Sequence, residues 1–230
     1  MLSVPIKTQA FLSNLPLFHE LETEEVDRLA AGTHEVRVKR GDMLFHKGDP
    51  CRGFHIVVYG QVKLLFITSK GDEKVIEIMG PGQSFGEAIM FLEKPYLVTG
   101  QALADTMLLH VAKEVVFEEV ERDARFARRV IAGLSRRLHQ LVSDVEAYSL
   151  RSATQRVIGY LLRPDQEYEN DPSSTTVTLP ASKAVIASRL NITPEHFSRI
   201  LHDLTMAQLI EVDGRRVRIL DIGRLHTFEG

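Results

Sequence analysis

The stretch NITPEHFSRILHDL, residues 191–204, has the pattern of a short amphipathic helix. Phe197, Leu201 and Leu204 recur at intervals of three or four residues, so a helix would place them on one side. Thr193 can cap the start of this helix, and the proline that follows it loses no hydrogen bond at the first helical position. The sequence therefore predicts a helix that begins after Thr193 and buries one apolar side.

The polar side of the same helix carries Glu195, Ser198 and Arg199 at positions i, i+3 and i+4. An arginine can donate two parallel hydrogen bonds to guanine, a glutamate can accept one from cytosine, and a serine can contact several bases. The alternative is a small protein-interaction domain whose polar helix face is simply solvated. The residue types favour the reading of base edges in DNA.

The segments on either side of this helix complete a known DNA-binding arrangement. Residues 182–190, SKAVIASRL, predict a preceding helix, and the runs LIEV and RVRIL predict two strands joined by a turn at Asp213 and Gly214. Helix, turn, helix and hairpin form a winged helix-turn-helix, whose second helix enters the major groove. Phosphate contacts supply affinity without sequence information. We assign these contacts to Thr193, His202, Arg215, Arg216 and Arg218.

The first half of the chain has a different pattern of apolar residues and glycines. Between residues 34 and 111, short apolar runs such as FHIVV and MLLHV alternate with turns that contain glycine. Many short strands at close spacing with glycine between them are typical of a β-barrel or sandwich. We therefore predict a β domain over residues 1–121 and a mixed α+β protein as a whole.

Residues 123–148 show a sustained heptad repeat, which predicts a helix of about 26 residues and roughly 40 Å. Neighbouring arginines keep the apolar stripe narrow, which favours a seam with a second copy over packing on the helix's own domain. We predict a dimerisation helix over residues 122–149 and a DNA-binding domain over 150–230. The stripe consists of Ala124, Ala127, Ile131, Leu134, Leu138, Leu141, Val145 and Tyr148.

Composition excludes several classes of protein. The chain of 230 residues has a net charge of −3 and one cysteine, Cys51, so an internal disulfide and a multi-cysteine metal site are excluded. No apolar run is long enough for a membrane span, and the N-terminus lacks a secretory pattern, so we expect a cytoplasmic protein without a membrane partner. No common catalytic motif occurs, and an enzyme is not expected.

Several segments together resemble the CRP/FNR family of bacterial transcription regulators. They are YGQVKL, FGEAIMFL, the long heptad helix and PEHFSRIL. The resemblance implies a β-roll of the cyclic-nucleotide-binding type (a jelly roll), a long dimerisation helix and a winged helix-turn-helix. It also implies an activator that binds duplex DNA as a homodimer and contacts RNA polymerase. The exposed turn TSKGDEK, residues 68–74, aligns with a polymerase-contacting region in some members; a solvated hairpin tip is the alternative.

The pattern Glu195-x-x-Ser198-Arg199 resembles the recognition helix of the FNR subgroup and departs from the R-E-x-x-x-R pattern of the CRP subgroup. This implies a palindrome of the type TTGAT-N4-ATCAA. Two recognition helices related by a dimer axis would lie about one DNA turn, ~34 Å, apart.

The family's effector pocket is matched only in part. Gly86 and Glu87 match the Gly-Glu pair that contacts the ribose in cyclic-nucleotide-binding members. Tyr96 and Leu97 stand where the resemblance calls for the Arg-Ser pair that neutralises the cyclic phosphate. A buried phosphate without a cation is unfavourable, so cyclic AMP is not expected. The alternative function is a regulator that responds to cyclic AMP or a related nucleotide.

The family also includes members that bind an iron–sulfur cluster or haem, and the cysteines and histidines of this chain bear on both cofactors. The iron–sulfur cluster of oxygen-sensing members needs four cysteines, so it is excluded. Residues 85–103 and 146–162 resemble the Dnr-type branch, which responds to nitric oxide, and this resemblance allows haem. No residue is assigned as a haem or metal ligand. His55 is interpreted as an outward-facing strand residue and His139 as a solvated one. We expect the signal to act between the β domain and the long helix.

Overall fold

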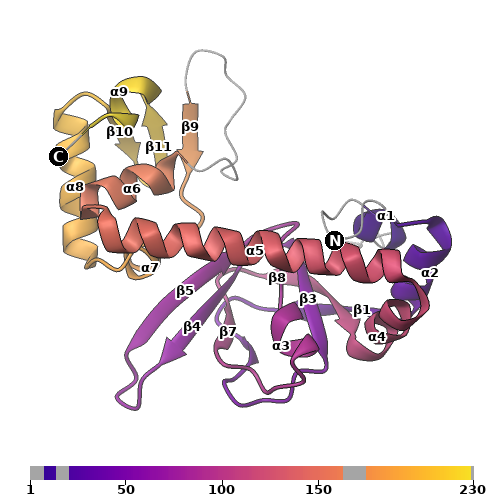
Figure 1. The fold of residues 1–230 in the computed structure, drawn as a ribbon. Helices are drawn as coiled ribbons and strands as arrows, with labels where there is room; N and C mark the ends of the chain where they lie inside the picture. The colour runs from indigo at the N-terminus through magenta and orange to yellow at the C-terminus, as the bar shows by residue number, and fades with distance from the viewer. Residues whose placement is uncertain (1–7, 14–20, 163–174, 229–230) are drawn as a thin grey trace, which may run out of the picture. The chain divides into compact units, whose positions relative to one another are not determined.

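The computed structural model describes residues 8–13, 21–162 and 175–228 (Figure 1). The chain forms two compact units, one of residues 1–73 and 77–140, the other of residues 74–76 and 141–230. The expected α+β fold, with an N-terminal β-roll and a C-terminal winged helix-turn-helix, is confirmed. The units divide within the long helix, and the division into residues 1–121, 122–149 and 150–230 stays a prediction.

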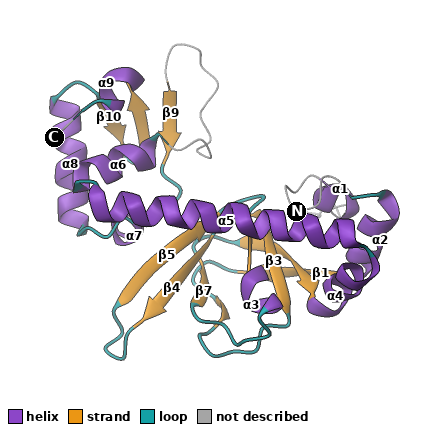
Figure 2. Cartoon of the chain, viewed as in Figure 1, coloured by secondary structure: helices purple, strands orange, loops and turns teal. Residues whose placement is uncertain are grey.

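The β-roll is built from two antiparallel sheets with the strand orders β1-β8-β3-β6 and β2-β7-β4-β5. In Figure 2, β4 and β5 form a long hairpin whose tip lies away from the rest of the roll. The strands are β1 (Thr33–Val38), β2 (Met43–Phe45), β3 (Gly53–Tyr59), β4 (Val62–Ile67), β5 (Glu73–Met79), β6 (Ser84–Phe85), β7 (Thr99–Ala102) and β8 (Thr106–Ala112).

Each strand of the sheet β1-β8-β3-β6 sends alternate side chains to opposite faces, as the period of two requires. Val57 and Leu108 lie in a buried cluster inside the roll. Phe54, Ile56 and Leu109 lie in a second cluster on the helical side of the sheet. The roll helices are α1 (Thr8–Ser13), α2 (Thr23–Ala31), α3 (Glu87–Phe91) and α4 (Lys113–Arg122).

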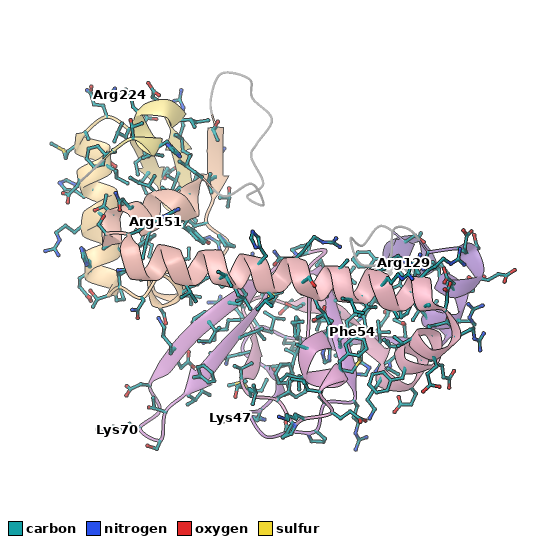
Figure 3. All side chains as sticks on the ribbon, viewed as in Figure 1. Lys47, Phe54, Lys70, Arg129, Arg151 and Arg224 are labelled. Atoms are coloured by element: carbon teal, nitrogen blue, oxygen red, sulfur yellow. The ribbon has the colours of Figure 1, made fainter. Side chains whose placement is uncertain are left out.

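The long helix α5 (Ala124–Leu150) carries apolar side chains along its length. Phe126 and Val130, in its first two turns, are buried in the same cluster as Phe54 and Ile56. Figure 3 labels Phe54 close beneath α5. Burial in this cluster ties the start of α5 to the β-roll.

Most of the predicted dimer stripe does not take part in this cluster. Ile131, Leu138, Leu141 and Val145 are among the exposed large apolar side chains of the single chain, whereas Leu134, also in the stripe, is half-buried against the β-roll core. Apolar side chains that remain exposed in a row along one helix are unusual in a monomer. The helix therefore carries an exposed apolar strip beyond the residues that pack on the β-roll.

Two ion pairs with buried carboxylates connect the helices of the β-roll. Arg28 on α2 donates two hydrogen bonds to the buried Glu119 on α4, at 2.5 and 2.9 Å. Arg129 on α5 lies 3.3 Å from the buried Glu25 on α2. Both carboxylates are thus paired, which a charge removed from water requires. The pairs hold α2 against α4 and against the start of α5.

In the described part of the second unit, helices α6, α7 and α8 accompany a three-stranded sheet of order β10-β11-β9, and α9 follows last in the chain. Its core includes Val157, Ile186, Phe197 and Val217. No helix among the described residues is long and apolar enough to span a membrane. The elements are α6 (Ala153–Leu161), β9 (Thr175–Thr178), α7 (Lys183–Arg189), α8 (Pro194–Met206), β10 (Ile210–Asp213), β11 (Arg216–Ile219) and α9 (Ile222–His226).

The prediction that His55 faces outward is wrong. His55 alternates with Phe54 and Ile56 on β3, and because these two residues pack against the helices, His55 points into the roll. There its ring stacks on Phe85, with ring centroids 5.3 Å apart. The sequence pattern did not reveal which face of this strand was the interior, since both faces are covered.

Replacement of Phe126 by Ala should lower the free energy of unfolding by about 3–5 kcal/mol, because a fully buried ring is lost from the cluster that holds α5. The matched control is Phe66→Ala on β4. Phe66 is exposed, so the same deletion should change stability by about 0.5 kcal/mol or less. Equilibrium urea unfolding followed by circular dichroism measures both. Equal losses would contradict the assignment of Phe126 to the core.

Candidate nucleic-acid interface and effector site

The helix-turn-helix is formed by α7 and α8. Both begin at a hydroxyl cap: Ser182 Oγ accepts a hydrogen bond from the Val185 amide and Thr193 Oγ1 accepts one from the His196 amide. Asn191 adopts a left-handed φ of 57°, which asparagine tolerates well. This turn ends α7 and starts α8 after only a few residues.

The two sides of α8 are as the sequence predicts. Phe197, Leu201 and Leu204 are buried, together with Ile200. The opposite side is exposed to solvent. Its members include the predicted base-reading residues and one predicted phosphate contact: Glu195, Ser198, Arg199 and His202. The predicted residues therefore lie together on one accessible helix face, although Thr193 uses its oxygen as the cap acceptor.

The wing is the hairpin of β10 and β11. Asp213 pairs with Arg216, so Gly214 and Arg215 form a two-residue loop, and Gly214 has the positive φ of 58° that such a turn needs. The side chains of Arg216 and Arg218 are exposed, on alternate positions from the buried Val217. Three arginines thus extend from one short hairpin.

Arg218 has a partner on the neighbouring strand. Arg218 lies 3.3 Å from Glu211, its cross-strand neighbour on β10. This pair is exposed and therefore weak, so a phosphate could compete for the guanidinium. The third strand of the sheet, β9, was not predicted, because its β-branched sequence TTVT is only 4 residues long and directly follows a polar stretch. β9 pairs with β11 and supports the wing from the other side.

The candidate effector residues belong to the β-roll. Gly86 has a φ of 101° and stands at the N-cap of α3, where a side chain would be strained. Glu87 is the first residue of α3 and is half-buried. Leu97 is exposed, whereas Tyr96 is buried. The four residues thus occupy different environments.

Tyr96 fills space inside the roll. Its ring stacks on Phe45 with centroids 3.7 Å apart and an interplanar angle of 13°. Phe45 can lie there because Gly100, its cross-strand partner, has no side chain; a Cβ would come within 2.7 Å of the phenyl ring. The sequence analysis missed Phe45 and Gly100, since a phenylalanine and a glycine on different strands give no local signal.

Tyr96 is held by further contacts. Its backbone amide donates to the Asp49 carbonyl at 2.9 Å, and its carbonyl accepts from the Gly48 amide at 2.8 Å. Burial raises the pKa of the Tyr96 hydroxyl well above its ordinary value, and a hydrogen bond with Cys51 raises it further. A neutral, stacked phenol is thus present in the region that sequence analysis assigned to a phosphate-binding cation.

Two family models match the chain. The model described as cyclic nucleotide-binding domain matches residues 35–123, and the Crp-like helix-turn-helix domain matches residues 155–228. The first covers most of the β-roll, and the second begins in α6 and ends after α9. Both matches agree with the folds of the two parts.

Individual relatives support the same assignment. The chain is 30% identical to the cyclic AMP receptor protein of Thermus thermophilus over 64% of this chain and 68% of that protein. It is 27% identical to the transcriptional activator protein Anr of Pseudomonas aeruginosa, over 94% and 88% of the two chains. The crystal structure of DNR from Pseudomonas aeruginosa is 33% identical, covers 99% of this chain and 100% of its own, and superposes with a TM-score of 0.55.

Relatives that are transcription regulators agree with the expectation that the chain is not an enzyme. The β-roll comes first in the chain and the helix-turn-helix with its hairpin follows, which agrees with the residues that the two family models match. The chain belongs to the CRP/FNR family of DNA-binding transcription regulators.

Proposed function

We propose that the chain is a homodimeric, sequence-specific DNA reader in which α8 enters the major groove of each half-site. The observation that carries this proposal is the exposed set Glu195, Ser198 and Arg199, fixed above the buried Phe197 and Leu201. Buried anchors on one side of α8 hold the polar side in a defined orientation, which base recognition needs. The arginines of the wing supply phosphate contacts beside the groove.

The proposed operator is an FNR-like palindrome of the type TTGAT-N4-ATCAA. Arg199 would donate to guanine O6 and N7, Glu195 would accept from a cytosine amino group, and Ser198 would complete the contact. The similarity to Anr over nearly the whole chain supports the FNR-like branch. The similarity to DNR supports the same side of the family.

The proposed dimer is formed by α5 and its copy. The exposed strip of Ile131, Leu138, Leu141 and Val145 follows a spacing of three, four and seven residues, which suits a two-stranded coiled coil. A second α5 would cover this strip with identical chemistry. The two-fold axis of such a dimer would match the two-fold symmetry of a palindromic operator.

We further propose that a signal reaches DNA through the start of α5. Phe126 and Val130 pack in one cluster with Phe54 and Ile56 of β3. A structural change in the roll would therefore shift the position of the start of α5 on the sheet. A small shift at one end of a long rigid helix moves the DNA-binding unit at its other end. RNA polymerase is the proposed partner of the β4–β5 hairpin tip, where Lys70 is exposed (Figure 3).

The described residues assign no haem ligand. The Nδ1 atoms of His55 and His110 are enclosed by protein atoms and have no hydrogen-bond partner. Haem therefore stays a prediction of the resemblance, and no step of the proposed function passes through it. An absorption spectrum with haemin, before and after nitric oxide, decides the question by a Soret band that shifts with the gas.

Replacement of Arg199 by Ala should weaken operator binding by about 1–3 kcal/mol and relax the preference at one base pair of each half-site. Fluorescence anisotropy on an operator and on its single-base variants measures both effects. The matched variant is Arg215→Ala in the wing loop. It should weaken binding equally on all sequences and reduce the salt slope by about one. An Arg199 variant that behaves like the Arg215 variant would mean that Arg199 holds only phosphate.

Replacement of Leu138 by Glu should convert the dimer to monomer and abolish palindrome binding, since each copy would place a carboxylate in the apolar seam. Sedimentation equilibrium gives the mass in solution. Arg136→Glu is the control, because it adds the same side chain to an exposed position at the far side of the heptad. Loss of the dimer in both variants would argue against the strip as the interface.

Cyclic AMP should leave the thermal unfolding midpoint unchanged even at millimolar concentration, because Tyr96 occupies the interior and offers no positive charge to a phosphate. Differential scanning fluorimetry measures the midpoint. Operator DNA is the positive control, because a ligand that binds only the folded chain must raise it. A saturable rise with cyclic AMP would instead support the cyclic-nucleotide alternative.

A further inference from the structure

Three histidines lie side by side across three neighbouring strands of the β-roll. His110 on β8 pairs in register with His34 on β1 and with His55 on β3. The ring centroids of His34 and His110 are 4.7 Å apart, and those of His55 and His110 are 4.8 Å apart. Because directly opposite residues in a sheet point to the same face, the three rings form one continuous histidine row.

The histidine row runs from solvent into the interior. His34 is exposed, His110 is half-buried, and the Nδ1 atoms of His110 and His55 are fully enclosed. Gly53 makes room for the middle ring, since a Cβ there would come within 2.8 Å of two atoms of the His110 imidazole. The row is therefore a packed part of the sheet that begins at its rim.

The surroundings of the histidine row favour neutral rings. Stacking on Phe85 encloses the inner ring, His55, and the ring of Phe45 lies 6.1 Å away. Burial, and then the charges of His110 and His34, lower the pKa of His55 to about 3. Burial also lowers the pKa of His110, and Glu114 opposes this only in part. The titratable groups on neighbouring elements are Glu114 on α4 and, behind Phe45, Tyr96 and Cys51.

Three neighbouring histidines also suggest a metal site. A row across three strands does not bring the three rings around one ion. The outer strands β1 and β3 flank β8, so His34 and His55 are separated by two strand spacings, about 9.6 Å. Three imidazoles on one ion must converge within about 2.1 Å of it. Among the described residues, no group of three or more metal-binding side chains is placed to hold an ion.

The opposite face of the same strands holds the long helix. Phe54 and Ile56 flank His55 on β3, and Leu109 precedes His110 on β8; all three pack in the cluster that contains Phe126. Charge on the histidine face would therefore disturb the strands on which the start of α5 rests. Because the histidines and the residues that contact α5 lie on opposite faces of the same strands, ionisation of the row would affect the packing of the start of α5.

We propose that the histidine row is an acid-sensitive switch, which loosens the β1-β8-β3 sheet and the start of α5 when its rings take up protons. Its effect on DNA rests on the proposed function, whereas its effect on the β-roll does not. A histidine with a lowered pKa in the folded state stabilises the fold above its ordinary pKa of about 6.5, and this stability is lost as pH falls. Each pH unit below that value favours unfolding by up to about tenfold for His55.

The test compares urea unfolding of the full chain and of His55→Phe between pH 7.5 and pH 5. The phenyl ring keeps the stack with Phe85 and cannot bind a proton. The unfolding constant of the parent chain should rise by up to about 30-fold more than that of the variant over this range. The control is His46→Gln, an exposed histidine of the same roll beside Asp49, which should keep the pH dependence of the parent.

His110→Gln provides a second arm, because His110 is only half-buried and burial lowers its own pKa. It removes one ring of the row and should reduce the acid loss in part. Parallel pH curves for the parent and for His55→Phe would overturn the proposal; if His55→Phe does not fold, parallel curves for His110→Gln would do so. Operator binding at pH 7.5 is measured separately. If the chain did not bind the operator, the proposed function would be overturned, and the unfolding curves would still test the switch.

Discussion

The alternation of side chains along β3 and β8 is the constraint on which the rest of the structure depends. Every second residue must point to the opposite face, so Phe54 and Ile56 hold the long helix while His55 and Val57 line the interior of the roll. A shift of one residue would exchange the two sets. The packing of α5 on the β-roll, the aromatic stacking inside the roll and the histidine row all depend on the register of these strands.

Features that depend on nearby residues could be predicted from the sequence. The caps and faces of α8, the turn at Gly214 and the extent of α5 follow from spacing and residue type within a few turns. The orientation of His55 could not be predicted, because β3 is covered on both faces and loses the polar–apolar alternation that marks an outer face. β9 was missed since it is stabilised mainly by pairing with β11, far along the chain.

The candidate sites also differ in whether they depend on nearby or on distant residues. The exposed set on α8 was predicted because its residues lie on one continuous helix. The environment of Tyr96 was not, because it requires Phe45 and Gly100, which are distant in sequence and meet only across the roll. The tyrosine at position 96 could be read from the sequence, whereas its stack on Phe45 could not. A shared fold therefore does not imply a shared effector.

The apolar side chains of the long helix follow two different spacings. Phe126, Val130 and Leu134 are spaced by four residues and pack against the chain's own β-roll. Ile131, Leu138 and Val145 are spaced by seven and remain exposed. Four residues advance a helix by about 40° beyond one full turn, whereas seven residues fall about 20° short of two turns, so the two rows slant in opposite directions across one broad apolar face. The inner row ends within the first three turns, and beyond it Leu138, Leu141 and Val145 are exposed.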